Sequence, residues 1–144
     1  MQALQLRERA GCAEAERKAW ERVGVLVAMR PAAGTGVHAQ YDDANLVAAL
    51  IAMEMKRMGV TASRYAAAFS ALHTWLRARS SLDWPRYRVF MAPGRTEFQR
   101  SGEPTATALA GFSLDLKPLC ARLFGDKRPE PLQRALPLPL GAVR

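Results

Sequence analysis

The sequence predicts a mainly α-helical protein with a small α+β appendage. Helix-forming stretches ended by glycine fill residues 1–80, whereas alternating apolar and polar residues, typical of strands, gather after residue 84. With 144 residues, of which 49% are apolar, the chain is long enough to bury one main core. We therefore expect a helical domain at residues 1–80, an α+β appendage at residues 81–124, and a disordered, proline-rich tail at residues 125–144.

The chain is strongly basic, with a formal net charge of +8. Such a balance favours polyanionic partners, nucleic acid first, because binding releases counterions. No apolar run reaches the ~18 residues that span a bilayer, and no secretory signal follows Met1. We expect a soluble cytoplasmic protein without a membrane partner.

Residue types that carry catalysis or bind metal are sparse. Cys12 and Cys120 match no spacing of a zinc or redox motif, and His38 and His73 are the two histidines. Paired carboxylates, an activated nucleophile and a phosphate-binding loop do not occur at a credible spacing. We expect no enzyme activity, no catalytic or metal site, and no cofactor.

Two short helices open the chain. Leu4, Leu6 and Ala10 anchor the first, which is predicted to stop at Gly11, and residues 13–23 form the second, which is predicted to end at Gly24. Two short helices joined by a tight turn make a helix-turn-helix, whose second helix commonly enters the DNA major groove. The alternative is an ordinary helical hairpin.

A glycine-tipped hairpin is predicted after the second helix. Residues 25–29 and 37–41 are strand-capable, and Gly34 and Gly36 suit the tip, because glycine adopts positive φ without strain. This pattern indicates a wing that approaches DNA. A plain surface hairpin remains the alternative.

Two further helices should complete the first domain. Residues 43–58 are apolar on most sides and predict a buried helix. Thr61 is predicted to cap the next helix, whose buried stripe consists of Tyr65, Phe69, Leu72 and Leu76. His73 falls off this stripe and is expected to be solvated.

The appendage is predicted to contain three strands and a short helix. The strands are expected at residues 86–91, 96–100 and 112–116, and the helix at residues 118–124. Its role could be packing, dimerisation or ligand capture.

Residues 4 to 76 resemble the winged helix-turn-helix DNA-binding domain of the MerR family of bacterial regulators. The stretch from Trp20 to Leu26, WERVGVL, is similar to the family's aromatic-Glu-Arg-apolar-Gly-Leu-Leu pattern. The glycine-rich segment GTGVHAQY at residues 34–41 resembles its wing, and the MGVT at residues 58–61 resembles a helix junction. Family members continue into a long dimerisation helix, which Trp84-Pro85 interrupts here. A homodimer would therefore use other residues beyond 80.

The resemblance implies a duplex DNA-binding transcription regulator, with Lys18 contacting DNA and with Trp20 and Arg22 supporting backbone contacts. Trp20 is as readily explained as half-buried core, and Arg17 as an extension of the basic face or a solvated residue. The predicted DNA-binding residues are Arg17, Lys18, Trp20, Arg22, Arg30, Thr35, His38, Gln40 and Tyr41. Within residues 4 to 76, three features depart from the family: Ala13 at the helix cap, Ala39 in the wing, and the acidic pair Glu14 and Glu16. The alternatives are an architectural accessory factor of recombination or phage DNA handling, and an interaction module that has lost DNA binding.

Overall fold

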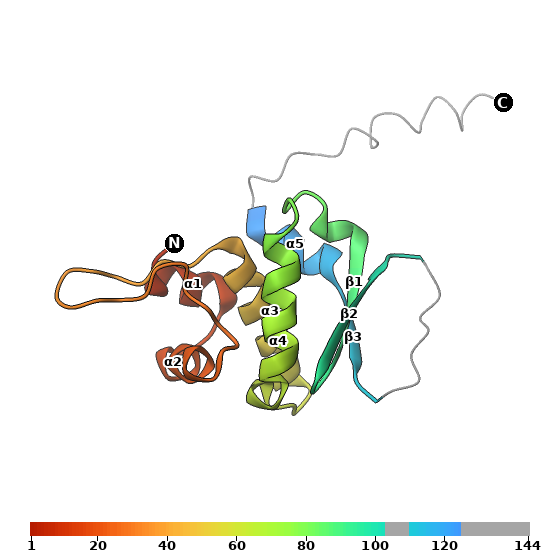
Figure 1. Cartoon of the computed structure of the whole chain (residues 1–144), viewed down its shortest axis with the longest axis horizontal. Helices are drawn as coiled ribbons and strands as arrows, with labels where there is room; N and C mark the ends of the chain where they lie inside the picture. The colour runs from red at the N-terminus through yellow and green to blue at the C-terminus, as the bar shows by residue number, and fades with distance from the viewer. Residues whose placement is uncertain (103–109, 125–144) are drawn as a thin grey trace, which may run out of the picture.

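The structure is a computed structural model that describes residues 1–102 and 110–124 (Figure 1). The described residues form five α-helices, two short 3-10 turns and one three-stranded antiparallel sheet. The helices are α1 (Ala3–Ala10), α2 (Glu14–Val23), α3 (Asp43–Arg57), α4 (Ala66–Arg77) and α5 (Leu116–Phe124). The strands are β1 (Tyr87–Ala92), β2 (Arg95–Arg100) and β3 (Phe112–Asp115), and the 3-10 turns are Ala62–Tyr65 and Trp84–Arg86. A predominantly helical chain with a small β part is confirmed. The predicted tail, residues 125–144, lies outside the described residues.

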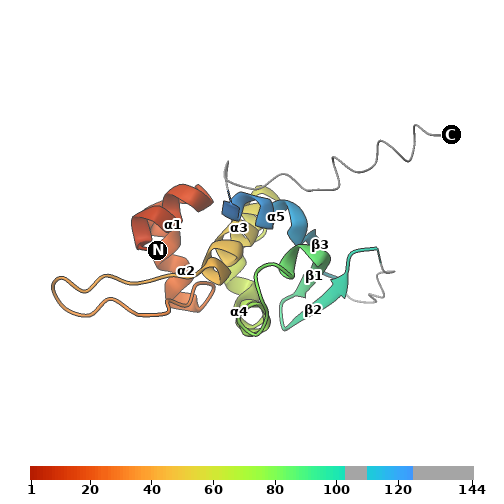
Figure 2. The same ribbon diagram turned by 90° about the horizontal axis from the view of Figure 1, so that it is seen from above.

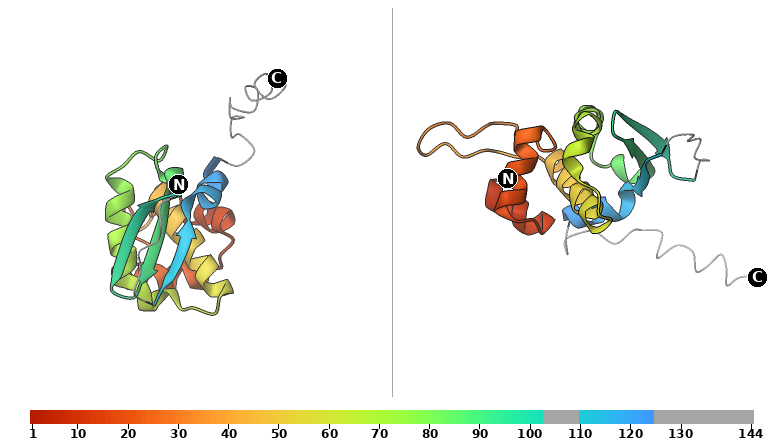
Figure 3. Two further views of the ribbon diagram at one scale, coloured as in Figure 1. Left: turned by 90° about the vertical axis from the view of Figure 1, so that its right-hand side faces the viewer. Right: turned by 90° about the horizontal axis from the view of Figure 1, so that it is seen from below.

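Helix α3 is the centre of the core. Its apolar positions cover most of its circumference, and Leu46, Leu50 and Ile51 are fully buried. Helices α1, α4 and α5 pack around it. Figure 3 shows the resulting order of layers. Helices α1 and α2 lie on one side of α3, whereas α4 and the sheet lie on its other side.

The sheet packs on α4 and shares the core with the helices. Its strand order is β2-β1-β3, and Val89 of β1 pairs with Phe98 and Leu114. Phe98 stacks on Trp75 of α4, with the ring centroids 4.0 Å apart. One continuous apolar cluster therefore runs from Leu6 to Cys120, across the predicted boundary at residue 80. The third strand ends at Asp115 and α5 begins at Leu116, two residues before its predicted start.

The predicted strands of the hairpin do not form. We call residues 25–41 the 25–41 loop; it extends from the helices as a long arm (Figures 1 and 2). Arg30 and Gln40 form an isolated bridge at its base, and residues 31–38 are exposed. Gly34 and Gly36 adopt positive φ at the tip, as expected. The strand prediction was wrong because a two-stranded ribbon needs a packed face, whereas Met29 at the base of this arm is 60% exposed.

Two predictions on α4 were also wrong. Thr61 makes no side-chain cap, because the 3-10 turn Ala62–Tyr65 intervenes before the α-helix and uses the Thr61 carbonyl instead. His73 is not solvated: it is 3% exposed, and its Nε2 lies 2.9 Å from the Val25 carbonyl oxygen. A polar partner on another segment thus draws a residue outside the apolar stripe into the core.

Candidate nucleic-acid interface

A tight turn sets α1 against α2. Gly11 takes φ 77° and donates its N–H to the Arg7 carbonyl, which ends α1 as predicted. At the start of α2, Ala13 offers no side-chain acceptor, but its own N–H donates to Glu16 Oε1 at 2.9 Å. Half of a reciprocal cap is therefore present despite the alanine.

Arg17 holds α2 to the end of the 25–41 loop. The side chain is buried, which neither sequence interpretation anticipated. Its Nη2 donates to Glu14 at 2.6 Å, and its Nη1 donates to Glu21 and to the Tyr41 hydroxyl, each at 2.7 Å. The hydrogen bond with Glu14 raises the pKa of Arg17 further above its usual value and lowers the pKa of Glu14. Arg17 is therefore fully engaged inside the protein.

Trp20 and Tyr41 belong to the core as well. Trp20 is 8% exposed, and its carbonyl accepts the N–H of Val25 at 2.9 Å. The Tyr41 hydroxyl donates to Glu21, and the Tyr41 backbone exchanges two hydrogen bonds with Met1. Burial and the bond to Glu21 raise the pKa of Tyr41 to about 12. Both aromatic residues therefore fix the relative positions of α2 and the loop.

Of the predicted DNA-binding residues, three are both exposed and close together: Lys18, Arg22 and His38. All three are exposed and line a cleft of about 740 Å³ between α1, α2 and the 25–41 loop. The remaining lining residues are Gln2, Ala3, Leu4, Arg17, Glu21, Ala32, Ala39 and Tyr41. Arg30 and Thr35 are exposed on the loop, away from this cleft, and Gln40 pairs with Arg30 at the loop base.

The acidic residues of α2 are neutralised by internal partners. Glu14 is paired with Arg17 and lies 3.4 Å from Arg7, and Glu16 accepts from Lys56 Nζ at 2.6 Å. The Ala13 backbone N–H and Lys56 lower the pKa of Glu16. Within the described residues, Lys18 and Arg22 form no ion pair, so the uncompensated charge at the cleft is positive.

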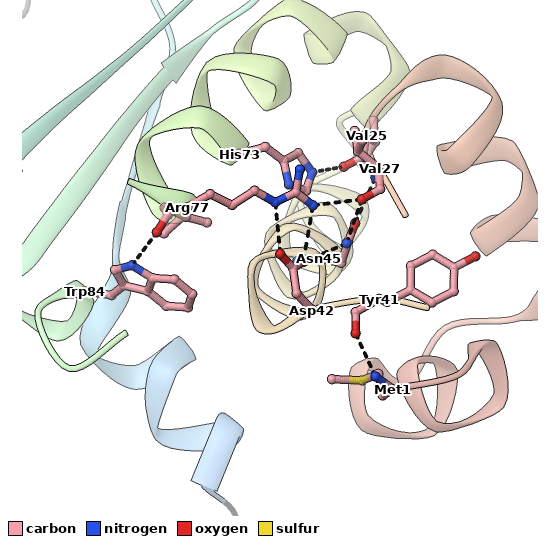
Figure 4. Close-up of polar contacts among 10 residues, drawn as sticks. Met1, Val25, Val27, Tyr41, Asp42, Asn45, His73, Arg77 and Trp84 are labelled. Atoms are coloured by element: carbon pink, nitrogen blue, oxygen red, sulfur yellow. Dashed lines mark hydrogen bonds and ion pairs between the residues drawn. The ribbon is translucent and has the colours of Figure 1, made fainter. Parts of the chain in front are cut away.

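A polar network fixes the root of the 25–41 loop to α3 and α4 (Figure 4). Asn45 of α3 accepts the N–H of Val27 and donates to its carbonyl, both at 2.8 Å. Arg77 of α4 donates to the same carbonyl at 2.8 Å and to Asp42 at 2.9 Å. The backbone at the root of the loop is therefore held by both α3 and α4.

Burial shapes the protonation of this network. Burial acts to raise the pKa of Asp42, but hydrogen bonds from Arg77 and from the Asn45 backbone outweigh it, so the pKa lies below its usual value. Burial lowers the pKa of His73, whose Nδ1 is buried without a partner in the described part of the chain. The network therefore holds a charged Asp42 and a neutral His73 near pH 7.

Sequence reasoning missed Asn45, Arg77 and His73 as residues that position the loop. The available signal was Asn45 itself, a single amide in an otherwise apolar helical run. Such a residue, when buried, needs partners for both its donor and its acceptor. Its partner, the Val27 backbone, could not be identified from side-chain patterns.

The described residues contain no group of three or more His, Cys, Asp or Glu side chains able to hold a metal ion. In the same ranges, no helix is long and apolar enough to cross a membrane. No family model matches the chain, and no curated protein matches its sequence.

Proposed function

We propose that this protein is a non-enzymatic, MerR-like regulator that binds duplex DNA with α2 and the 25–41 loop, which act as a winged helix-turn-helix. The carrying observation is the cleft between them, where Lys18 and Arg22 are exposed and unpaired while every carboxylate of α2 has an internal cation. Uncompensated cations beside an exposed helix face favour contact with phosphates. The proposal includes a cytoplasmic location in bacteria.

The nine predicted residues divide into two roles in this proposal. Arg17, Trp20 and Tyr41 position α2 against the loop, because their polar atoms and rings are turned inward. Lys18 and Arg22 contact DNA from α2. On the loop, DNA is contacted by Arg30, Thr35, His38 and Gln40. Pre-positioning of this kind reduces the entropy lost on binding.

A second candidate is an interaction module that binds a protein instead of DNA. The observation that favours it is the exposure of Val27, Met29 and Val37 on the 25–41 loop, since phosphate contacts do not require apolar side chains. An architectural DNA-binding role is a variant of the first candidate, and it differs in how the DNA sequence is read.

The test is duplex binding measured by fluorescence anisotropy across a range of salt concentrations. We expect affinity that falls as salt rises, and a variant carrying Lys18→Ala and Arg22→Ala that binds more weakly with a shallower salt slope. Lys117→Ala with Arg122→Ala is the matched control, because both residues are exposed on α5 and the loss of charge is the same.

Two results would separate the candidates. An affinity that does not change with salt, or that falls equally in the control, would exclude DNA recognition by α2 and favour the interaction module. If binding behaves as expected, selection from random duplex DNA assigns the role. A palindromic site indicates a regulator, and enrichment of bent or A/T-rich DNA without a motif indicates an architectural factor.

A further inference from the structure

A second cluster of unpaired cations lies where α4 meets the start of β1 and the end of β2. The guanidinium carbon of Arg79 sits 4.7 Å from the ring centroid of Trp75 and 5.4 Å from that of Tyr87. Arg100, the register partner of Tyr87 across the sheet, lies 5.9 Å from the same tyrosine centroid. The end of α4 and the strand β2 therefore bring two guanidinium groups to one aromatic ring of β1.

Both guanidinium groups keep their N–H donors available. Arg79 and Arg100 are exposed, and neither makes a side-chain hydrogen bond or an ion pair in the described part of the chain. A guanidinium that covers a ring uses its face and leaves its in-plane donors free. The nearby Asp83 lies 3.6 Å from Arg86, so it is already matched by a third arginine. The cluster therefore presents exposed guanidinium groups without a polar partner in the described part of the chain, and it carries excess positive charge.

The geometry favours phosphate over a nucleobase as the ligand. Trp75 is stacked on Phe98 with an interplanar angle of 2°, and Arg79 lies over its ring. Tyr87 meets Trp75 edge-on and has Arg79 and Arg100 over its ring. Bases bind such platforms by stacking on an open ring face, whereas phosphate oxygens accept from the edges of guanidinium groups. Because other side chains already cover these rings, the groups that remain to bind a ligand are the N–H donors of the two guanidinium groups.

The cluster is adjacent to the root of the 25–41 loop. Arg77, two residues before Arg79, donates from its Nη2 to the Val27 carbonyl. The end of α4 that leads into the cluster therefore also contacts the root of the loop.

We propose that Arg79 and Arg100 form a second phosphate-binding site, which contacts the backbone of the same duplex that α2 and the 25–41 loop bind. This inference rests on the proposed function and extends it to residues beyond the winged helix-turn-helix. The site contributes affinity and orientation without reading sequence, because phosphate contacts carry no base information.

The test compares Arg79→Ala with Arg100→Ala, combined in one variant, with a matched control of Arg95→Ala and Arg122→Ala. The control removes the same charge from the opposite end of β2 and from α5. Binding is measured against salt on a duplex of about 30 base pairs, roughly 100 Å long at 3.4 Å per base pair. Thermal unfolding shows that each variant is folded.

We expect the Arg79/Arg100 variant to bind more weakly and to lower the salt slope by about 2, one unit for each lost phosphate contact, with the preferred sequence unchanged. The control should keep a slope close to that of the unaltered protein. An unchanged slope in the Arg79/Arg100 variant, or an equal loss in the control, overturns the second site while leaving α2 as the DNA contact. If the unaltered protein binds no duplex at all, the proposed function fails and the second site fails with it.

Discussion

Replacing Asn45 with alanine probes how the 25–41 loop is held. The side chain is fully buried and makes both a donor and an acceptor contact with the Val27 backbone, together with a 2.8 Å hydrogen bond to Asp42 Oδ1. In Asn45→Ala, the Val27 carbonyl keeps its bond from Arg77, whereas the Val27 N–H loses its partner. The variant therefore removes the attachment of the loop to α3 and keeps its attachment to α4.

The expected cost follows from these bonds. Each of the two lost bonds with Val27 contributes about 1 kcal/mol to the free energy of unfolding, whereas the third lost bond adds little because Asp42 Oδ1 still accepts from the Asn45 backbone N–H and from Arg77. Leaving the Val27 N–H without a partner adds about 1 kcal/mol, near the low end of that penalty because this residue is partly solvent-accessible. We therefore expect Asn45→Ala to destabilise the fold by about 2 to 3 kcal/mol.

Urea denaturation followed by circular dichroism measures this difference. The control is Thr74→Ala, which removes one exposed hydrogen bond, from Thr74 Oγ1 to the Ser70 carbonyl, and should cost less than about 0.5 kcal/mol. Hydrogen exchange gives a second readout, because the Gln40 amide at the loop base should exchange faster in Asn45→Ala while amides of β1 do not. A cost no larger than that of the control, with unchanged exchange at Gln40, would refute the role assigned to Asn45.

Three further predictions concern the buried residues Tyr41 and His73 and the oligomeric state. Burial and the bond to Glu21 raise the pKa of Tyr41 to about 12, so Tyr41→Phe should remove a late step from the tyrosinate absorbance titration; a titration unchanged in Tyr41→Phe contradicts this. Because the folded protein favours the neutral form of Tyr41, the contribution of Tyr41 to stability should be lost as pH rises from 10 towards 12. The pKa of His73 is lowered, so the unfolded chain takes up a proton first, and stability should fall as pH drops below 6.5. His73→Gln should show a shallower fall in urea denaturation, and an identical pH profile would count against this. A homodimer through residues beyond 80 should give twice the mass of one chain in light scattering, whereas the mass of one chain argues against it.

The boundaries of α1, α2 and α3 were predictable because local chemistry determines them. Gly11 and Gly24 end α1 and α2 with positive φ, and Asp42 caps α3 by accepting the N–H of Asn45 at 3.0 Å. The strands of the sheet were predictable for a similar reason, because alternation and the turn at residues 93–94 indicate a hairpin directly.

The predictions that failed depend on contacts between distant segments. Arg17 is buried because Glu14, Glu21 and Tyr41 surround its guanidinium, and the last of these is 24 residues away. His73 is buried because the Val25 carbonyl lies 48 residues earlier in the chain. Neither partner is visible in a periodic pattern. Of the candidate site, the sequence therefore predicted the exposed cations Lys18 and Arg22 but not the network that positions them.

The most direct test of the central claim, that α2 and the 25–41 loop contact duplex DNA, is an amide NMR titration of the labelled protein with duplex DNA. If α2 and the loop contact the duplex, chemical-shift changes should concentrate at residues 17–22 and 34–38, with those of Lys18 and Gly36 among the largest. Changes confined to α5 and the sheet, or none at a concentration where DNA is bound, would contradict it.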